Sequence, residues 1–288
     1  MNIFLIIFII LLILGILAGV IMFIDCHRLV VREYNVSSPK LKKDLDIILL
    51  TDLHSKSLGR DNSKLVEKID SIKPDLILVA GDMYTAAFND KGTVAIKLFK
   101  EISSRYPIYY SNGNHEQKTK LLCEEFNDVY EGYLSKIKEM GINHLTNEST
   151  YLADDNIRIF GLELPFLYYR KRGRKMPGVT GITDCIGTCD DNAFNLMIAH
   201  NPLYFDDYAD WGADLVLSGH VHGGLMRLPY LGGVLSPNYR FFPKYSGGRY
   251  EKDGSVMVLS CGLGTHHIPA RINNPAELSL IHLKTEVI

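Results

Sequence analysis

The amino-acid sequence predicts an α/β sandwich of mixed sheets, preceded by an apolar N-terminal helix. Between residues 45 and 217, short apolar runs alternate with amphipathic segments of helical period, which is typical of strands joined by helices. The apolar runs at residues 256–260 and 278–283 have no helix between them, so we expect mixed sheets. The 288 residues, 47% apolar and 22% charged, suffice for one large domain with a sizeable core.

The N-terminal segment is predicted to be an uncleaved transmembrane anchor over residues 1–24. Residues 3–24 are 22 residues without a charge, long enough to cross the hydrocarbon core of a bilayer. A soluble helix would carry a polar face, and a signal peptide would carry basic residues before a shorter apolar core; the run has neither. Residues 25–44 are polar and are expected to be a tether to a single domain at residues 45–288.

Charge and cysteine content predict where this domain lies. Five basic residues follow the apolar run closely and none precedes it, so the positive-inside rule places the domain of a single-pass membrane protein on the cytoplasmic face. The five cysteines favour reduced thiols, with Cys185 and Cys189 as the one pair that could join or bind metal. The net charge of −2 argues against a general nucleic-acid binder.

The elements of the domain follow from apolar runs and from helix start and stop signals. Buried strands are expected at residues 47–51, 76–80, 108–110, 157–161, 194–199, 214–217, 256–260 and 278–283. Helices are expected from a cap at residues 61–63 to Pro74, over residues 94–102, and over a longer stretch, residues 122–140, that Gly141 ends. Residues 166–192 begin with aromatic side chains and continue with five basic residues between 170 and 175, and we expect a cap region there.

Residues of metal-ligand type follow five of these strands. They are Asp52 and His54, Asp82, Asn114 and His115, His200, and His220 and His222. Each has an ordinary explanation alone, such as a turn, a helix cap or a core histidine. Together they are expected to meet outside the carboxyl ends of the strands, where open α/β sheets bind ligands. Imidazoles mixed with carboxylate and amide oxygens suit two divalent ions of the Mn, Fe or Zn class, a pair able to promote displacement at phosphorus.

These residues stand in ordered motifs, and residues 45–284 resemble the calcineurin-like metallophosphoesterases. The motifs are Asp52-Leu53-His54, Gly81-Asp82, Gly113-Asn114-His115-Glu116, the lone His200 and Gly219-His220-Val221-His222. The resemblance implies an αββα sandwich with two metal ions. It implies Asp52, His54 and His222 on one metal, Asn114, His200 and His220 on the other, and Asp82 as the bridge. His115 would contact the phosphate and help to protonate the leaving group, a role that suits a group titrating near neutral pH.

One position departs from the family pattern, because Thr85 stands where many members carry a supporting Asp. A closer similarity, to membrane-anchored members of the YkuE group and to UDP-2,3-diacylglucosamine pyrophosphatases, rests on the anchor and on motifs at residues 211–214, 223–229, 236–237 and 262–271. That similarity implies phosphate contacts by Arg227, His266 and Arg271.

The expected function is hydrolysis of a phosphomonoester, phosphodiester or pyrophosphate bond in a lipid-linked or UDP-sugar substrate at the membrane. The basic stretch at residues 170–175 is either a solvated loop or a cap that meets an anionic headgroup. Two alternatives stay open: a phosphodiesterase for soluble substrates that the anchor only localises, and a metal-binding scaffold without hydrolysis. His115 argues against the scaffold, because a scaffold needs no proton donor.

Overall fold

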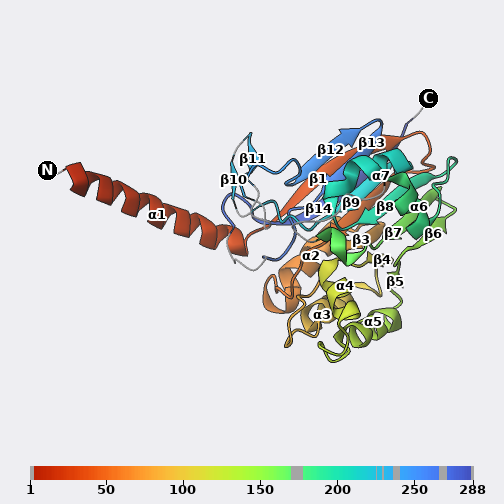
Figure 1. Cartoon of the computed structure of the whole chain (residues 1–288), viewed down its shortest axis with the longest axis horizontal. Helices are drawn as coiled ribbons and strands as arrows, with labels where there is room; N and C mark the ends of the chain where they lie inside the picture. The colour runs from red at the N-terminus through yellow and green to blue at the C-terminus, as the bar shows by residue number, and fades with distance from the viewer. Residues whose placement is uncertain are drawn as a thin grey trace.

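The computed structural model describes residues 3–169, 178–224, 226–228, 230–235, 241–265 and 271–286. Two six-stranded sheets pack face to face, and helices cover the outer face of each sheet (Figure 1). This arrangement confirms the predicted α/β sandwich of mixed sheets. A long helix, α1 (Ile3–His27), projects from the domain at its N-terminal end.

The first sheet has the order β1-β14-β2-β3-β4-β5. Its strands are β1 (Leu29–Ser38), β14 (Ala276–Thr285), β2 (Leu45–Leu50), β3 (Leu76–Ala80), β4 (Ile108–Ser111) and β5 (Asn143–His144). All neighbouring pairs are parallel except β14 with β2. Helices α2 (Ser63–Ile72) and α3 (Thr93–Ile102) connect the parallel strands, as the helix signals predict.

The second sheet has the order β12-β13-β9-β8-β7-β6. Its strands are β12 (Gly248–Lys252), β13 (Ser255–Leu259), β9 (Leu215–Ser218), β8 (Phe194–Ala199), β7 (Ile157–Leu162) and β6 (Glu148–Leu152). The four central strands are parallel, and the two outer strands are antiparallel to their neighbours. Helices α6 (Val179–Ile186) and α7 (Phe205–Trp211) lie on its outer face, where α7 packs on Phe160 and Met197.

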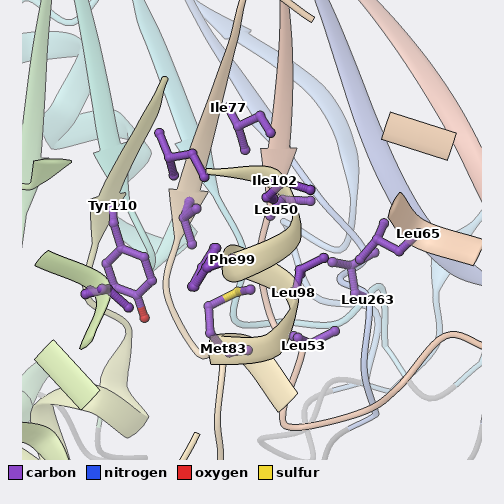
Figure 2. Packing of buried hydrophobic residues seen from close by; sticks show 14 of the residues in the cluster. Leu50, Leu53, Leu65, Ile77, Met83, Leu98, Phe99, Ile102, Tyr110 and Leu263 are labelled. Atoms are coloured by element: carbon purple, nitrogen blue, oxygen red, sulfur yellow. The ribbon is translucent and has the colours of Figure 1, made fainter. Parts of the chain in front are cut away.

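Three apolar layers hold the sandwich together, one between the two sheets and one outside each sheet. The central layer joins side chains of both sheets, such as Leu49 and Leu78 with Leu196 and Leu217. The layer outside the first sheet packs Leu50 and Ile77 against α2 and α3, as Figure 2 shows for Leu65, Leu98, Phe99 and Ile102. Because both faces of the central strands are buried, these strands read as continuous apolar runs.

The segment predicted to be a polar tether is instead an integral strand, which corrects the expected boundary at residue 45. All ten residues of β1 pair in parallel with β14, from Leu29 opposite Ala276 to Ser38 opposite Thr285. The inward side chains Tyr34 and Val36 are buried. The sequence pattern that indicates this strand is a short alternation of apolar and polar residues, several of them charged. The polar composition of residues 25–44 concealed it.

The helix expected over residues 122–140 is shorter, because only α5 (Val129–Glu139) lies in that range, and a separate helix, α4 (Asn114–Leu121), precedes it. The break has a local cause, since Asn127 and Asp128 have positive φ angles of 50° and 55°. Asn and Asp adopt this left-handed conformation more readily than other non-glycine residues, and it cannot continue an α-helix.

Helix α1 is long and apolar enough to cross a membrane by length and composition alone, and none of its most apolar window is buried against the domain. It runs three residues beyond the predicted boundary at residue 24, and Asp25 in its last turn is buried. Arg28 pairs with Asp25 at 3.3 Å, and β1 begins at the next residue. The helix therefore meets the domain directly.

Candidate metal centre

Five strands end beside one another and deliver the candidate ligands to one place. Strands β2, β3 and β4 of the first sheet end just before Asp52, Asp82 and Asn114. Strands β8 and β9 of the second sheet end just before His200 and His220. The site thus lies where the carboxyl ends of both sheets meet, the position that the strand pattern predicts.

One group of candidate ligands consists of Asp52, His54 and His222. The Nε2 atoms of His54 and His222 are 3.1 Å apart, and Asp52 Oδ1 lies 3.3 Å from His222 Nε2. Asp52 is fully buried. Such crowding of imidazole nitrogens around a buried carboxylate is typical of ligands that share one cation.

A second group consists of Asp82, His200 and His220. Asp82 Oδ2 lies 3.1 Å from His200 Nε2 and 3.8 Å from His54 Nε2, so this one oxygen faces both groups. The other oxygen, Asp82 Oδ1, accepts a hydrogen bond from the backbone N–H of His115 at 2.8 Å. Asp82 therefore stands between the two groups, with its orientation fixed by the backbone.

The donor atoms fit divalent metal ions. The buried Asn114 Oδ1 has no hydrogen-bond partner among the described residues, and buried polar atoms are otherwise almost always paired. The Nδ1–H of His200 donates to the carbonyl of Ala80 at 2.5 Å, which leaves the Nε2 lone pair facing the site. Carboxylate, amide and imidazole donors in this proportion suit ions of the Mn, Fe or Zn class.

Burial and the neighbouring histidines shift the pKa values of the two candidate carboxylate ligands. Burial raises the pKa of Asp52 to about 7, against the opposing attraction of His200. Burial acts in the same direction on Asp82, but His200, His115 and His54 outweigh it and hold the pKa of Asp82 well below its usual range. Two carboxylates this close and this deeply buried need compensating positive charge.

Most of the candidate ligands have an unusual backbone conformation. Five of the seven have positive φ angles between 46° and 75°: Asp52, His54, Asp82, His220 and His222. A non-glycine residue in this region costs on the order of 1–3 kcal/mol and persists only where its surroundings hold it. Strained residues of this kind cluster at functional sites.

His115 is placed as a hydrogen-bond donor to the site. The backbone N–H of Ala86 donates to its Nδ1 at 2.8 Å, so the ring proton of the neutral imidazole is on Nε2. That Nε2 atom lies 4.0 Å from Asp82 Oδ2. His115, His54 and Asp82 also form a third group of candidate ligands.

Glu116 is a site residue whose part the sequence motif does not reveal. Its fully buried carboxylate accepts hydrogen bonds from the backbone N–H groups of Asp82, Met83 and Gly113 and from Tyr110 Oη, all between 2.8 and 3.0 Å. Burial, with the nearby charge of Asp82, raises its pKa to about 7. Glu116 thereby joins the loop that carries Asp82 to the loop that carries Asn114.

The departure at Thr85 is compensated nearby. Thr85 Oγ1 lies 3.4 Å from His54 Nδ1, and Asp90 accepts the backbone N–H of Thr85 at 2.9 Å. Asp90 also accepts from Ser55 Oγ at 2.7 Å. The hydroxyl of Thr85 thus stands where it can accept the Nδ1 proton of His54, and a carboxylate one step further away fixes the loop.

The aromatic side chain of Tyr169 covers the second group of candidate ligands. The ring of Tyr169 packs edge-on against His220, with centroids 5.2 Å apart, and lies 6.1 Å from His200. Tyr169 ends the short helix η2 (Phe166–Tyr169), so the aromatic start of the expected cap region lies over the site. The basic residues 170–175 lie outside the described residues.

Arg227 and Arg271, for which phosphate contacts are predicted, both contact neighbouring loops, and their binding of phosphate stays a prediction. Arg271 is buried, and its guanidinium donates only to backbone carbonyls, among them Cys261 and Gly262 at 3.0 Å. Arg227 Nη1 donates to the carbonyl of Ser246 at 2.9 Å. Both side chains hold loops together, a role that a sequence motif cannot distinguish from substrate binding; His266 lies outside the described residues.

The cysteines form no disulfide among the described residues, in keeping with the predicted reduced thiols. Cys185 and Cys189 are unjoined, and burial raises the pKa of both thiols. Neither belongs to a group of candidate metal ligands in the described part of the chain.

Comparison with known proteins gives a consistent result. The family model of the calcineurin-like phosphoesterases matches residues 45–224. A metallophosphoesterase of Campylobacter jejuni is 30% identical over 260 residues, which cover 88% of this chain and 63% of that protein. The metallophosphoesterase YkuE of Bacillus subtilis is 23% identical over 282 residues, 93% of this chain and 90% of YkuE.

Two further proteins are similar to this chain, one in sequence and one in structure. A Helicobacter pylori metallophosphoesterase is 26% identical over 261 residues. This chain spans 63% of the length of both the C. jejuni and the H. pylori relatives. The crystal structure of a phosphopantetheinyl hydrolase from Mycobacterium tuberculosis is similar with a TM-score of 0.42 and 14% identity, over 74% of this chain and 87% of that chain. A score this low carries no conclusion about function.

Proposed function

The chain belongs to the calcineurin-like phosphoesterase family, and we propose that it hydrolyses a phosphoester or pyrophosphate bond with two divalent metal ions. The observation that carries the proposal is the convergence of Asp52, Asp82 and the imidazoles into three overlapping groups, with donor atoms within 4.8 Å of one another in each. The family uses divalent metal ions, generally two.

We assign the ligands as two sets that share Asp82. Asp52, His54 and His222 form one set, and Asn114, His200 and His220 form the other. The short distances from Asp82 Oδ2 to His54 and His200 and the unpaired Asn114 Oδ1 support this assignment. When bound, the two ions supply a nucleophile near neutral pH and stabilise negative charge at phosphorus.

His115 is assigned to the substrate rather than to a metal. Its Nε2–H, fixed by the bond from Ala86 to Nδ1, can donate to a phosphoryl oxygen or to the leaving group. The bond from the backbone of His115 to Asp82 keeps this ring beside the bridging carboxylate. Tyr169 excludes water from one side of the second set of ligands.

The experiment that tests the proposal measures metal content and hydrolysis together. Asp82→Asn should lower the occupancy of both metal positions and abolish turnover of an aryl phosphodiester, because it removes the shared ligand. Asp154→Asn, the same change at an exposed carboxylate, is the control and should leave both measurements unchanged. If the purified active protein binds one ion or none, two-metal hydrolysis is wrong.

At the finer level we propose that the enzyme is anchored in a membrane by α1 and acts on a lipid-linked or UDP-diacylglucosamine-like phosphate. The apolar composition of α1 and its lack of burial against the domain support the anchor. The basic residues Arg28, Arg32 and Lys40 after the helix, with none before it, support a cytoplasmic domain. A reporter fused after residue 288 should behave as cytoplasmic, and protease access to the domain in intact cells would contradict this orientation.

A further inference from the structure

An apolar patch is exposed on the short hairpin that follows the metal-binding turn and on residues 241–242, which pair with the chain just after the hairpin. The hairpin consists of β10 (Arg227–Leu228) and β11 (Gly232–Gly233). The patch consists of Leu228, Tyr230, Leu231, Phe241 and Phe242. Tyr230 is fully exposed, and Leu231 and Phe241 are 64% and 71% exposed. Outside α1, the described part of the chain exposes twelve large apolar side chains, and five of them fall within these 15 residues.

The patch is built on a small sheet. Val234 donates to the carbonyl of Met226 and Phe242 donates to the carbonyl of Val234, both at 2.9 Å. Arg227 donates its backbone N–H to Ile272 at 3.0 Å, and its guanidinium holds the carbonyl of Ser246. Exposed aromatic side chains on a hydrogen-bonded frame are costly in water, so a contact with a partner is the expected reason for them.

Two sets of contacts tie the end of α1 to the loops that carry metal ligands. Asp25 Oδ2, in the last turn of α1, accepts the backbone N–H of Asn274 at 3.1 Å. The side-chain amide of Asn274 donates to the carbonyls of His222 and Gly224, at 2.6 and 2.7 Å. Arg227, where the hairpin begins, is only three residues beyond Gly224. Figure 1 accordingly draws β10 and β11 beside the domain end of α1.

The second tie comes from the other side of the site. Lys56 Nζ donates to the carbonyl of Cys26 at 2.6 Å. Cys26 is in the last turn of α1, and Lys56 lies two residues after His54. The end of the helix is therefore bonded both to the loop of His54 and, through Asn274, to the turn of His222.

The length of the apolar helix fixes the level of these contacts in a bilayer. The 22 uncharged residues 3–24 rise about 33 Å as an α-helix, against a hydrocarbon core of about 30 Å. Asp25 then lies at the boundary between the acyl chains and the headgroups. The hairpin starts from the turn that Asn274 joins to Asp25, so its aromatic residues reach the same level, where Tyr and Phe side chains partition well.

Basic side chains surround the same end of the helix. Arg28, Lys64 and Lys68 line a groove together with His27, and Glu67 is its one acidic side chain. Positive charges at headgroup level attract anionic lipids by about 1 kcal/mol each. The groove and the patch thus give this side of the domain the charged and apolar components of a membrane-contacting surface.

We propose that the apolar patch inserts into the headgroup region of the bilayer that holds α1, as a second point of contact, and so fixes the metal centre at the membrane surface. The inference rests on the proposed membrane anchor and deepens it. A domain held at two points cannot rotate about the end of α1, so a phosphate ester would reach the ligand loops from the bilayer surface. That placement favours substrates whose apolar part stays in the membrane.

The test locates tryptophan side chains in the full-length protein, reconstituted in nanodiscs of phosphatidylcholine and phosphatidylglycerol. Tyr230→Trp and, independently, Phe241→Trp report on the patch. Tyr151→Trp is the matched control, because Tyr151 is exposed on β6, at the far side of the domain from α1 in Figure 1. Phe8→Trp reports on α1 itself. The native Trp211 is buried, and the wild-type spectrum is subtracted.

Brominated lipids should quench tryptophan at positions 8, 230 and 241 but not at 151, and acrylamide should quench the patch at least about threefold less than position 151. If lipid quenches position 8 but not positions 230 and 241, the patch proposal is wrong and the anchor stands. If position 8 also escapes the lipid, the anchor itself is wrong. Protection of the patch from both quenchers would show that protein covers it, and would equally overturn the proposal.

Discussion

Removal of β1 should unfold the domain, although the sequence first suggests that residues 25–44 are dispensable. We compare a chain that begins at Asp25, which keeps β1, with one that begins at Leu45, which lacks it. In the intact protein, Arg32 Nε lies 3.1 Å from Glu277 Oε2, and Tyr34 Oη donates to Glu277 Oε1 at 3.0 Å. The Glu277 side chain is fully buried.

The expected loss can be worked out from these contacts. Tyr34, Val36 and Leu41 are buried, and each such side chain contributes about 1.5–3 kcal/mol. Leaving Glu277 without Arg32 costs about 3–5 kcal/mol more, because a buried charge loses its partner. The sum is about 8–14 kcal/mol, which is comparable to the 5–15 kcal/mol that stabilises a typical domain. The exposed edge of β14 would add a site for aggregation.

The assay is urea denaturation of both chains, in which far-UV circular dichroism monitors unfolding and size-exclusion chromatography detects aggregation. The chain from residue 25 should give one cooperative transition, whereas the chain from residue 45 should be aggregated or show no transition. Arg32→Met in the longer chain is a milder test and should lower the free energy of unfolding by about 3 kcal/mol. Equal midpoints and slopes for the two chains would refute the assignment of β1 to the core.

Three further predictions concern the site. His115→Asn should keep the metal content but slow hydrolysis of substrates with poor leaving groups about 10²–10⁴-fold, and an equal loss on activated aryl phosphates would argue against proton donation. Glu116→Gln should lower both stability and metal occupancy, because an amide N–H2 would then face backbone N–H donors; unchanged metal titration would contradict its role in joining the ligand loops. Burial, with Lys138 and Lys120, lowers the pKa of His144 to about 4 in the folded protein. Only the unfolded chain then binds this proton between pH 6.5 and 4, so His144 makes the protein less stable as the pH falls through that window. His144→Asn should remove up to about 3 kcal/mol of that pH dependence, and parallel stability curves for the variant and wild type would show the prediction to be wrong.

The strands and the candidate ligands were largely predictable because both follow from short-range patterns. Strands β3 and β8 have the predicted bounds, since an apolar run buried on both faces can take few other forms. The candidate ligands stand at strand ends, so the strand assignment and the parallel order bring Asp52, Asp82 and His200 to one edge of the sandwich.

What escaped prediction depends on contacts between residues far apart in the chain. Strand β1 is stabilised by Glu277, 245 and 243 residues after Arg32 and Tyr34, and no local pattern contains that pair. Arg271 donates to carbonyls of loops that only the folded chain brings around it, and no local pattern contains these contacts. The tether was predicted from the polar composition of residues 25–44 alone, and composition carries no information about a partner strand so far along the chain.

The motif glycines show how the sequence pattern and the strained backbone of the site are connected. A Cβ on Gly113 would lie 2.2 Å from Asp82 Oδ1, and a Cβ on Gly219 would lie 2.3 Å from Asp52 Oδ2. Each glycine therefore lets one ligand loop approach a carboxylate carried by another. Asp52 and Asp82 have positive φ, which costs free energy that these close packed loops and the bonds to Glu116 must offset. A side chain at Gly113 or Gly219 would push the loops apart, so the motif spacing encodes the separation of the two ligand sets as well as the identity of the ligands.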